Sequence, residues 1–155
     1  MALPLSYRTI HDSDLPFLFQ VYASTREQEL LLTGWSEKEK NDFLSQQFEA
    51  QHKYYQQIYD QGEEFLIIVK ERVEIGRLYV GRWGNNIHII DITLLPQYRN
   101  HGIGSNILTE LLGEAHTKGG QVSIHVEKTN IALRLYHRLG FVIDKDEGVY
   151  WRLIN

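Results

Sequence analysis

The chain has 155 residues, 43% of them hydrophobic, with 16 basic and 20 acidic side chains and a net charge of −4. This length and composition predict one globular domain with its own core. The acidic balance and the lack of a basic cluster argue against a nucleic-acid partner. The sequence contains no cysteine, which excludes disulfides, a thiol nucleophile and a cysteine-ligated zinc.

The longest apolar runs, residues 65–69 and 87–95, have the length of strands. They are much shorter than the ~20 residues that a membrane-spanning helix needs. The first residues lack the apolar segment of a signal peptide. We therefore expect a cytoplasmic protein that does not associate with membranes.

Capping and turn residues divide the first half of the chain into a strand and helices. Asp12 and Ser13 are suitable N-cap residues, and Ser36 with Glu39 forms a capping box. The predicted elements are a strand over residues 5–10, a helix from there to about residue 23, a short apolar run over 30–32, and a helix from residue 36 to about 62.

Short apolar strands and helices make up the second half. The predicted elements are strands over 65–69, 75–80 and 87–95, a turn over 81–86 before the last of these, a helix with an apolar face over 103–115, a strand over 122–126, a helix that starts at Thr129 or Asn130, and strands over 141–143 and 149–154. This order predicts a single sheet layered with helices, of the α/β (α+β) class.

Residues 99–104, with the sequence RNHGIG, lie between the strand at 87–95 and the next helix. The first turn of a helix has free N–H groups and attracts phosphate, and glycine lets the backbone approach a ligand closely. Arg99 adds a fixed positive charge. The pattern predicts a pyrophosphate-binding loop, with an ordinary glycine turn as the alternative. It is neither a P-loop nor a dinucleotide fingerprint, which would need a glycine at Ile107.

The order of motifs resembles the GNAT family, the GCN5-related N-acetyltransferases. The acetyl-CoA loop of that family reads [R/Q]-x-x-G-x-[G/A], and its second signature is an Asn followed by a helix that ends in Tyr and then Gly-Phe. Both are matched in order, by Arg99, Gly102 and Gly104 and by Asn130, Tyr136, Gly140 and Phe141. The resemblance covers roughly residues 64–154, whereas residues 1–63 match only in arrangement.

The resemblance implies a single domain, residues 1–155, with a mixed, mostly antiparallel sheet flanked by helices. In this domain, residues 64–155 would bind acetyl-CoA and residues 1–63 would face the acceptor. It implies acetyl-CoA as the acyl donor and no metal. Backbone amides of the loop would hold the pyrophosphate, and the strand before the loop would separate from its neighbour. The implied cofactor-binding residues are Leu94, Arg99, Asn100, His101, Gly102, Ile103, Gly104, Ser105 and Asn130.

Tyr136 lies on the apolar stripe of its helix, where a tyrosine is typically a core residue with a satisfied hydroxyl. In the family, the tyrosine at this place donates a proton or a hydrogen bond to the CoA sulfur. The resemblance therefore assigns Tyr136 as the general acid. It assigns Asn130 a contact to the cofactor or its loop, whereas the residue type alone fits a plain N-cap.

His88 and Asp91 are the candidates for the general base. A histidine has an ordinary pKa of about 6.5, whereas an aspartate among isoleucines needs a partner or a function. Their odd spacing puts them on opposite faces of a regular strand, unless a bulge intervenes. We rank Asp91 first. The alternatives are a purely structural Asp91, a base at Glu27 or Glu29, and a chain of water molecules.

These residues predict an acyltransferase that passes the acetyl group of acetyl-CoA directly to an amine in a ternary complex. The acceptor would be a primary amine on a small molecule, a protein N-terminus or a lysine. The alternatives are a CoA-binding module without catalysis and an acyltransferase that uses another acyl-CoA. A homodimer through residues 149–154 is a further alternative, because that strand either pairs with another chain or closes the sheet.

Overall fold

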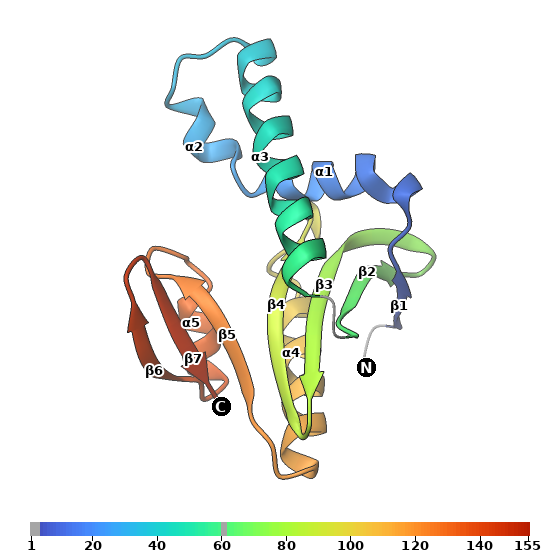
Figure 1. Cartoon of the computed structure of the whole chain (residues 1–155), viewed down its shortest axis with the longest axis vertical. Helices are drawn as coiled ribbons and strands as arrows, with labels where there is room; N and C mark the ends of the chain where they lie inside the picture. The colour runs from blue at the N-terminus through green and yellow to red at the C-terminus, as the bar shows by residue number, and fades with distance from the viewer. Residues whose placement is uncertain (1–3, 60–61) are drawn as a thin grey trace.

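The computed structural model describes residues 4–59 and 62–155, and these form a seven-stranded sheet in the order β1-β2-β3-β4-β5-β7-β6 (Figure 1). Neighbouring strands are antiparallel, except β4 and β5, which run parallel. The mixed, mostly antiparallel sheet is the predicted one. The strands are β1 (Leu5–Thr9), β2 (Glu64–Lys70), β3 (Val73–Trp83), β4 (Asn86–Leu94), β5 (Val122–Glu127), β6 (Val142–Glu147) and β7 (Tyr150–Ile154).

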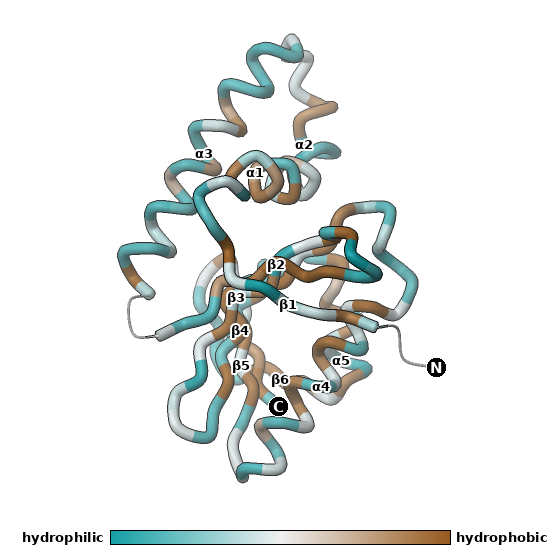
Figure 2. Tube along the Cα trace, turned by 90° about the vertical axis from the view of Figure 1, so that its right-hand side faces the viewer, coloured by the Kyte–Doolittle hydropathy of each residue, from teal (hydrophilic) through white to brown (hydrophobic). Residues whose placement is uncertain are grey.

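Helices cover both sides of the sheet, as Figures 1 and 2 show. We call the side that packs on α4 and α5 the α4 face, and the side that packs on α1 and α3 the α3 face. None of the described helices is long and apolar enough to cross a membrane. The helices are η1 (Asp12–Asp14), α1 (Leu15–Ser24), α2 (Glu27–Leu31), α3 (Glu37–Ile58), η2 (Pro96–Tyr98), α4 (Ile103–Thr117) and α5 (Leu133–Arg138).

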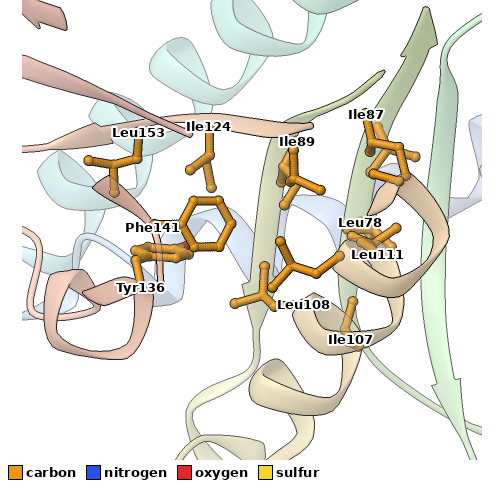
Figure 3. Close-up of a cluster of buried hydrophobic side chains, with 14 of the residues drawn as sticks. Leu78, Ile87, Ile89, Ile107, Leu108, Leu111, Ile124, Tyr136, Phe141 and Leu153 are labelled. Atoms are coloured by element: carbon orange, nitrogen blue, oxygen red, sulfur yellow. The ribbon is translucent and has the colours of Figure 1, made fainter. Parts of the chain in front are cut away.

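The larger core lies on the α4 face. Leu108 and Leu111 of α4 meet Ile89 of β4 and Ile124 of β5, and all four side chains are buried (Figure 3). The helical spacing of the apolar residues in α4 predicted this stripe. Each such side chain stabilises the fold by about 1.5–3 kcal/mol relative to an exposed one, so this core fixes α4 against the middle of the sheet.

A smaller core on the α3 face joins Leu18 of α1 and Phe48 of α3 to Ile67 of β2. The predicted capping box starts α3. The Glu39 N–H donates to Ser36 Oγ at 3.1 Å, and the Ser36 N–H donates to Glu39 Oε1 at 3.2 Å. These bonds satisfy N–H groups that the first turn of a helix otherwise leaves without a partner.

β4 contains one more residue than β3 over the same length. Tyr79 pairs with Asp91 and Val80 pairs with Ile89, so Ile90 has no partner on β3. This is a β-bulge, which bends a strand and increases its local twist.

The bulge changes which face the following residues point to. Ile87 and Ile89 pack in the α4-face core before the bulge, and Ile92 packs there after it. His88 and Asp91 therefore both lie on the α3 face. Opposite faces were expected for a regular strand, with a bulge as the exception. The structure has that exception, because Ile90 shifts the alternation by one residue.

The backbones of β4 and β5 separate at the bulge. The two strands pair at Ile87–Val122, His88–Ser123 and Ile89–Ile124, and their pairing ends there. Figure 1 shows the two ribbons moving apart beyond this point. We call the region between residues 90–94 of β4 and residues 125–127 of β5 the strand gap.

Several element boundaries differ from the predicted ones: β6 extends to Glu147, α3 ends at Ile58, and part of the apolar run at 30–32 belongs to α2. Two further differences lie close to the site. β3 continues to Trp83 through the predicted turn, because Gly81 leaves room for the Trp83 indole: a Cβ there would lie 2.7 Å from Trp83 Cζ2. α5 begins at Leu133 rather than at residue 129 or 130. Asn130 forms a side-chain turn ahead of the helix, in which its Oδ1 accepts from the Ala132 N–H at 2.8 Å.

The last strand lies inside the sheet. β7 pairs with β5 on one side and with β6 on the other. Of the two alternatives for residues 149–154, closure of the sheet within one chain is therefore the one that the structure contains. The edge strand beside β7 is β6. Its residues 144–147 are all charged, and such residues discourage pairing with another chain.

Candidate functional site

The strand gap exposes one edge of β4. The Leu95 N–H donates to Ile75 O of β3 at 2.8 Å. Because alternate residues of a strand direct their backbone groups to opposite edges, the Leu94 N–H points away from β3, toward the strand gap. The predicted separation of this strand from its neighbour is thus present. The use of the Leu94 amide to polarise a carbonyl stays a prediction.

The glycine loop turns sharply into α4. Asn100 and Gly102 have φ angles of 62° and 82°, and Gly102 is the N-cap of α4. The N–H groups of residues 103–105 come before the first hydrogen bond of the helix, which runs from Asn106 N to Gly102 O. A Cβ at Gly102 or Gly104 would meet no atom within 4 Å. Open space therefore lies over a row of N–H groups, which is the geometry of an anion site.

The side chains of the loop have different surroundings. Arg99 Nε donates to Leu94 O at 2.9 Å, and Arg99 Nη2 donates to Ser24 Oγ at 3.1 Å. Arg99 thus joins the loop to the end of β4 and to the end of α1. Asn100 and His101 are exposed, whereas the Ile103 side chain is buried in the core, so Ile103 offers only its amide. The predicted phosphate contacts of these residues remain predictions.

Tyr136 lies in the α4-face core, 5% exposed, with its ring edge-on to Phe141 at 5.6 Å between ring centres (Figure 3). Burial, followed by the negative charge of Asp91, raises the pKa of the Tyr136 phenol to about 12. The phenol is therefore protonated at neutral pH. That is the state that a hydrogen-bond donor or a general acid needs.

Asp91 is paired. Its Oδ2 accepts from Arg77 Nη2 at 2.8 Å, and its Oδ1 accepts from Thr93 Oγ1 at 2.7 Å. Arg77 is 3% exposed, and its Nη2 also donates to Gln51 Oε1 of α3 at 3.0 Å. The carboxylate thus has the partner that its apolar neighbours required, and it neutralises a guanidinium held between the sheet and α3.

His88 lies in the part of β4 that is still paired with β5. Its Nδ1 is 2.8 Å from Ser123 Oγ, and its ring stacks on Trp83 with 5.7 Å between ring centres. Burial first, and then the charges of His125 and Arg152, lower the pKa of His88 to about 4. The imidazole is therefore neutral at pH 7, and it is a weaker base than an ordinary histidine.

The other candidates lie elsewhere. Glu29 forms an ion pair with Arg26 at 3.0 Å on the exposed side of α2, which fits a solvated segment. Asn130 is exposed and uses its side chain in the turn before α5. Within residues 4–59 and 62–155, no three His, Asp or Glu side chains are grouped as metal ligands would be.

Sequence reasoning missed a pocket of about 370 Å³ on the α3 face. It lies at the closed end of the strand gap, where β4 and β5 are still paired, and its wall includes His88, one of the two candidate bases. Trp83, Ser123 and Arg152 also line it. No local motif marks these three residues, because they come from three strands and meet only through the order of the sheet.

The fold is shared with solved acetyltransferases. It is similar to PaiA N-acetyltransferase from Thermoplasma acidophilum in complex with coenzyme A, with 18% identity, a TM-score of 0.70 and 99% of each chain covered. It is also similar to YncA from Salmonella typhimurium, solved with its cofactor acetyl-CoA, with 20% identity, a TM-score of 0.56 and coverage of 97% of this chain and 92% of that one.

A third similar structure is the ribosomal-protein-S18-alanine N-acetyltransferase from Escherichia coli, with 16% identity, a TM-score of 0.58 and coverage of 97% of this chain and 91% of that one. At these identities the likeness establishes the fold alone. No curated protein sequence matches the chain. The model of the acetyltransferase (GNAT) domain matches residues 25–150. The chain therefore belongs to the GNAT family of acetyl-CoA-dependent N-acetyltransferases.

Proposed function

We propose that this enzyme transfers the acetyl group of acetyl-CoA directly to an amine, with both substrates bound at once. The observation that carries the proposal is the strand gap, which is flanked by different groups on its two faces. The glycine loop and Tyr136 belong to the α4 side, whereas the α3-face pocket opens at the closed end of the gap. Donor and acceptor can then meet through the sheet without an acyl-enzyme.

The proposed roles follow from the surroundings of each group. Residues 99–105 hold the pyrophosphate through backbone N–H groups, and the Leu94 N–H polarises the acetyl carbonyl. The amine nitrogen bonds to the carbonyl carbon while the carbon–sulfur bond breaks. The Tyr136 phenol gives its proton to the leaving sulfur, and the proton released by the amine passes to solvent. Residues 1–63 contribute the acceptor side of the site.

Steady-state kinetics test the direct route. With acetyl-CoA and a reactive amine both varied, double-reciprocal lines should intersect, because both substrates must bind before a product leaves. Parallel lines would indicate an acyl-enzyme intermediate and overturn the direct route. Propionyl-CoA serves as the donor control, and a higher kcat/KM with it than with acetyl-CoA would reassign the acyl group.

Gly102→Asp should abolish or greatly weaken binding of CoA. The new side chain would occupy the open space over the loop and put a negative charge beside phosphate, so we expect at least about a tenfold rise in Kd by calorimetry, or about 1.4 kcal/mol. Gly119→Asp is the matched control, because Gly119 also has a positive φ (+77°) and open space around it, at the other end of α4. Unchanged affinity in a folded Gly102→Asp protein would show that the phosphate binds elsewhere.

Tyr136→Phe should keep the packing against Phe141 and remove the proton donor. We expect kcat to fall by roughly 10²–10⁴, with CoA affinity and the free energy of unfolding nearly unchanged. Tyr54→Phe on the exposed side of α3 is the control. Wild-type turnover of Tyr136→Phe, measured where chemistry limits the rate, would leave Tyr136 as a core residue only.

Asp91 should matter more to amine transfer than His88. Asp91→Asn breaks the pair with Arg77 at the strand gap, and a displacement of about 1 Å there is enough to lower kcat/KM for the amine by up to about 10²-fold. CoA affinity should stay unchanged. Arg77→Met breaks the same pair and should cause a similar loss. An Asp91→Asn protein that is less stable but fully active would make Asp91 purely structural.

His88→Gln should have the smaller effect on kcat/KM. Because the pKa of His88 is lowered in the folded state, the neutral ring stabilises the fold above about pH 6.5, and this stabilisation is lost as the pH falls toward 4. His88→Gln should therefore reduce the loss of stability between these pH values. If the variant instead removes the rising limb of the pH–rate profile, His88 is the base and the ranking is wrong.

A further inference from the structure

The α3-face pocket is placed to receive the acceptor of the proposed reaction. Its walls come from the end of β3, the start of β4, β5 and β7, with Tyr59 at the end of α3. His88 and Ser123 line this wall and pair with each other across β4 and β5. The next pair, Ile89–Ile124, is the last one before the two strands separate. One residue of a strand spans about 3.3 Å, so the inner end of the pocket lies beside the strand gap. Its volume, about 370 Å³, fits a small molecule.

An indole held in a fixed position forms one wall of the pocket. Trp83 lies over Gly81, where a Cβ would come within 2.7 Å of the ring, and it stacks on His88 with 18° between the ring planes. Trp83 is nevertheless 43% exposed. One side of the indole thus packs against protein, while the rest of its surface is open. A planar ring of a ligand could stack on that open surface.

The charge of the pocket is unusual for a site that would bind a cationic amine. Among the described residues in its wall, none is Asp or Glu. Arg152 carries the one permanent charge there, and its Nη1 donates to Asp144 on β6, which fixes the guanidinium. The remaining polar side chains are the amides of Asn86 and Gln121, the hydroxyls of Tyr59 and Ser123, the Trp83 indole and two imidazoles. Burial lowers the pKa of His88 and keeps that ring neutral. Two carboxylates lie behind the wall, and both are already engaged: Asp144 accepts from Arg152, and Glu147 Oε2 lies 2.8 Å from His125 Nε2. A polycation would have to displace one of these contacts to gain a carboxylate partner.

We propose that the α3-face pocket binds the acceptor, and that it selects an amine on a molecule with a planar aromatic ring and a carboxylate group. The ring would lie on Trp83 and the carboxylate would bind Arg152, which leaves the amine at the inner end, where the pocket meets the strand gap. A guanidinium held from behind by Asp144 is preorganised for such a contact. This inference rests on the proposed function, because it takes the strand gap as the place of acetyl transfer.

Three probe amines separate the two features of the acceptor. L-Phenylalanine has the ring and the carboxylate, phenethylamine has the ring alone, and spermidine is a polycation. With saturating acetyl-CoA, kcat/KM should be highest for phenylalanine, lower by about tenfold for phenethylamine, and lowest for spermidine. A preference for spermidine, or equal values for all three, would overturn the inference.

Two variants then assign each feature to its residue. Arg152→Gln should lower kcat/KM for phenylalanine by about tenfold and leave phenethylamine within about twofold. Trp83→Leu should lower the values for both aromatic amines, and Gly81→Ala, which forces the indole out of its place, should do the same. Trp35→Leu is the matched control, since Trp35 is 38% exposed at the other end of α3. An equal effect of Arg152→Gln on both amines would overturn the carboxylate assignment.

Calorimetry with CoA separates the two proposals. If the wild-type protein binds CoA and acetylates spermidine better than phenylalanine, the proposed function stands and the acceptor class is wrong. If it binds no CoA, the proposed function itself fails and the pocket has no role in acetyl transfer.

Discussion

The extra residue in β4 is the constraint on which the rest of the site depends. Isoleucines at positions 87, 89 and 92, with Leu94, cannot all face the α4 core from a regular strand, because the spacing changes from even to odd between 89 and 92. The bulge at Ile90 resolves this conflict. It lets the core run along the whole strand and bends β4 at the point where its pairing with β5 ends. The bulge therefore links the position of the strand gap to the packing of the core. In a regular β4, the Asp91 side chain would point into the core beneath α4.

The buried pair of Arg77 and Asp91 holds the bulge from the other face. Asp91 is the first residue after Ile90, and its partner Arg77 reaches it from β3 while contacting Gln51 of α3. An ion pair of this kind costs desolvation on both sides and is seldom more stable than apolar residues of the same size. The pair therefore serves mainly to hold three elements in position. It connects the bulged segment of β4 to the neighbouring strand and to α3. Loss of either partner leaves the other charge buried and uncompensated.

The fold and the donor loop were predictable because their signals are local. The spacing of apolar residues predicted the strands and the apolar stripe of α4, and Ser36 with Glu39 predicted the start of α3. The glycines at 102 and 104 predicted the loop, and their lack of a Cβ leaves its backbone open. The sequence allowed a bulge between His88 and Asp91 but did not predict one. A shift of register depends on the partner strand, which the sequence does not identify. The start of α5 was misplaced because Asn130 is equally suited to an N-cap and to a side-chain turn.

In the proposed reaction the two substrates are recognised by different kinds of group, and this explains why the sequence predicts one of the two sites and not the other. The donor loop would act through backbone N–H groups, so the sequence needs only small residues at fixed spacing, and these form a motif. The α3-face pocket would act through side chains such as Trp83 and Arg152, which are far apart in the sequence and line one pocket only because β7 lies beside β5 in the sheet. Substitutions in that wall leave the loop, the bulge and Tyr136 untouched. Acceptor choice can therefore vary among chains that share the whole donor motif, and the residues that determine it are found from the structure.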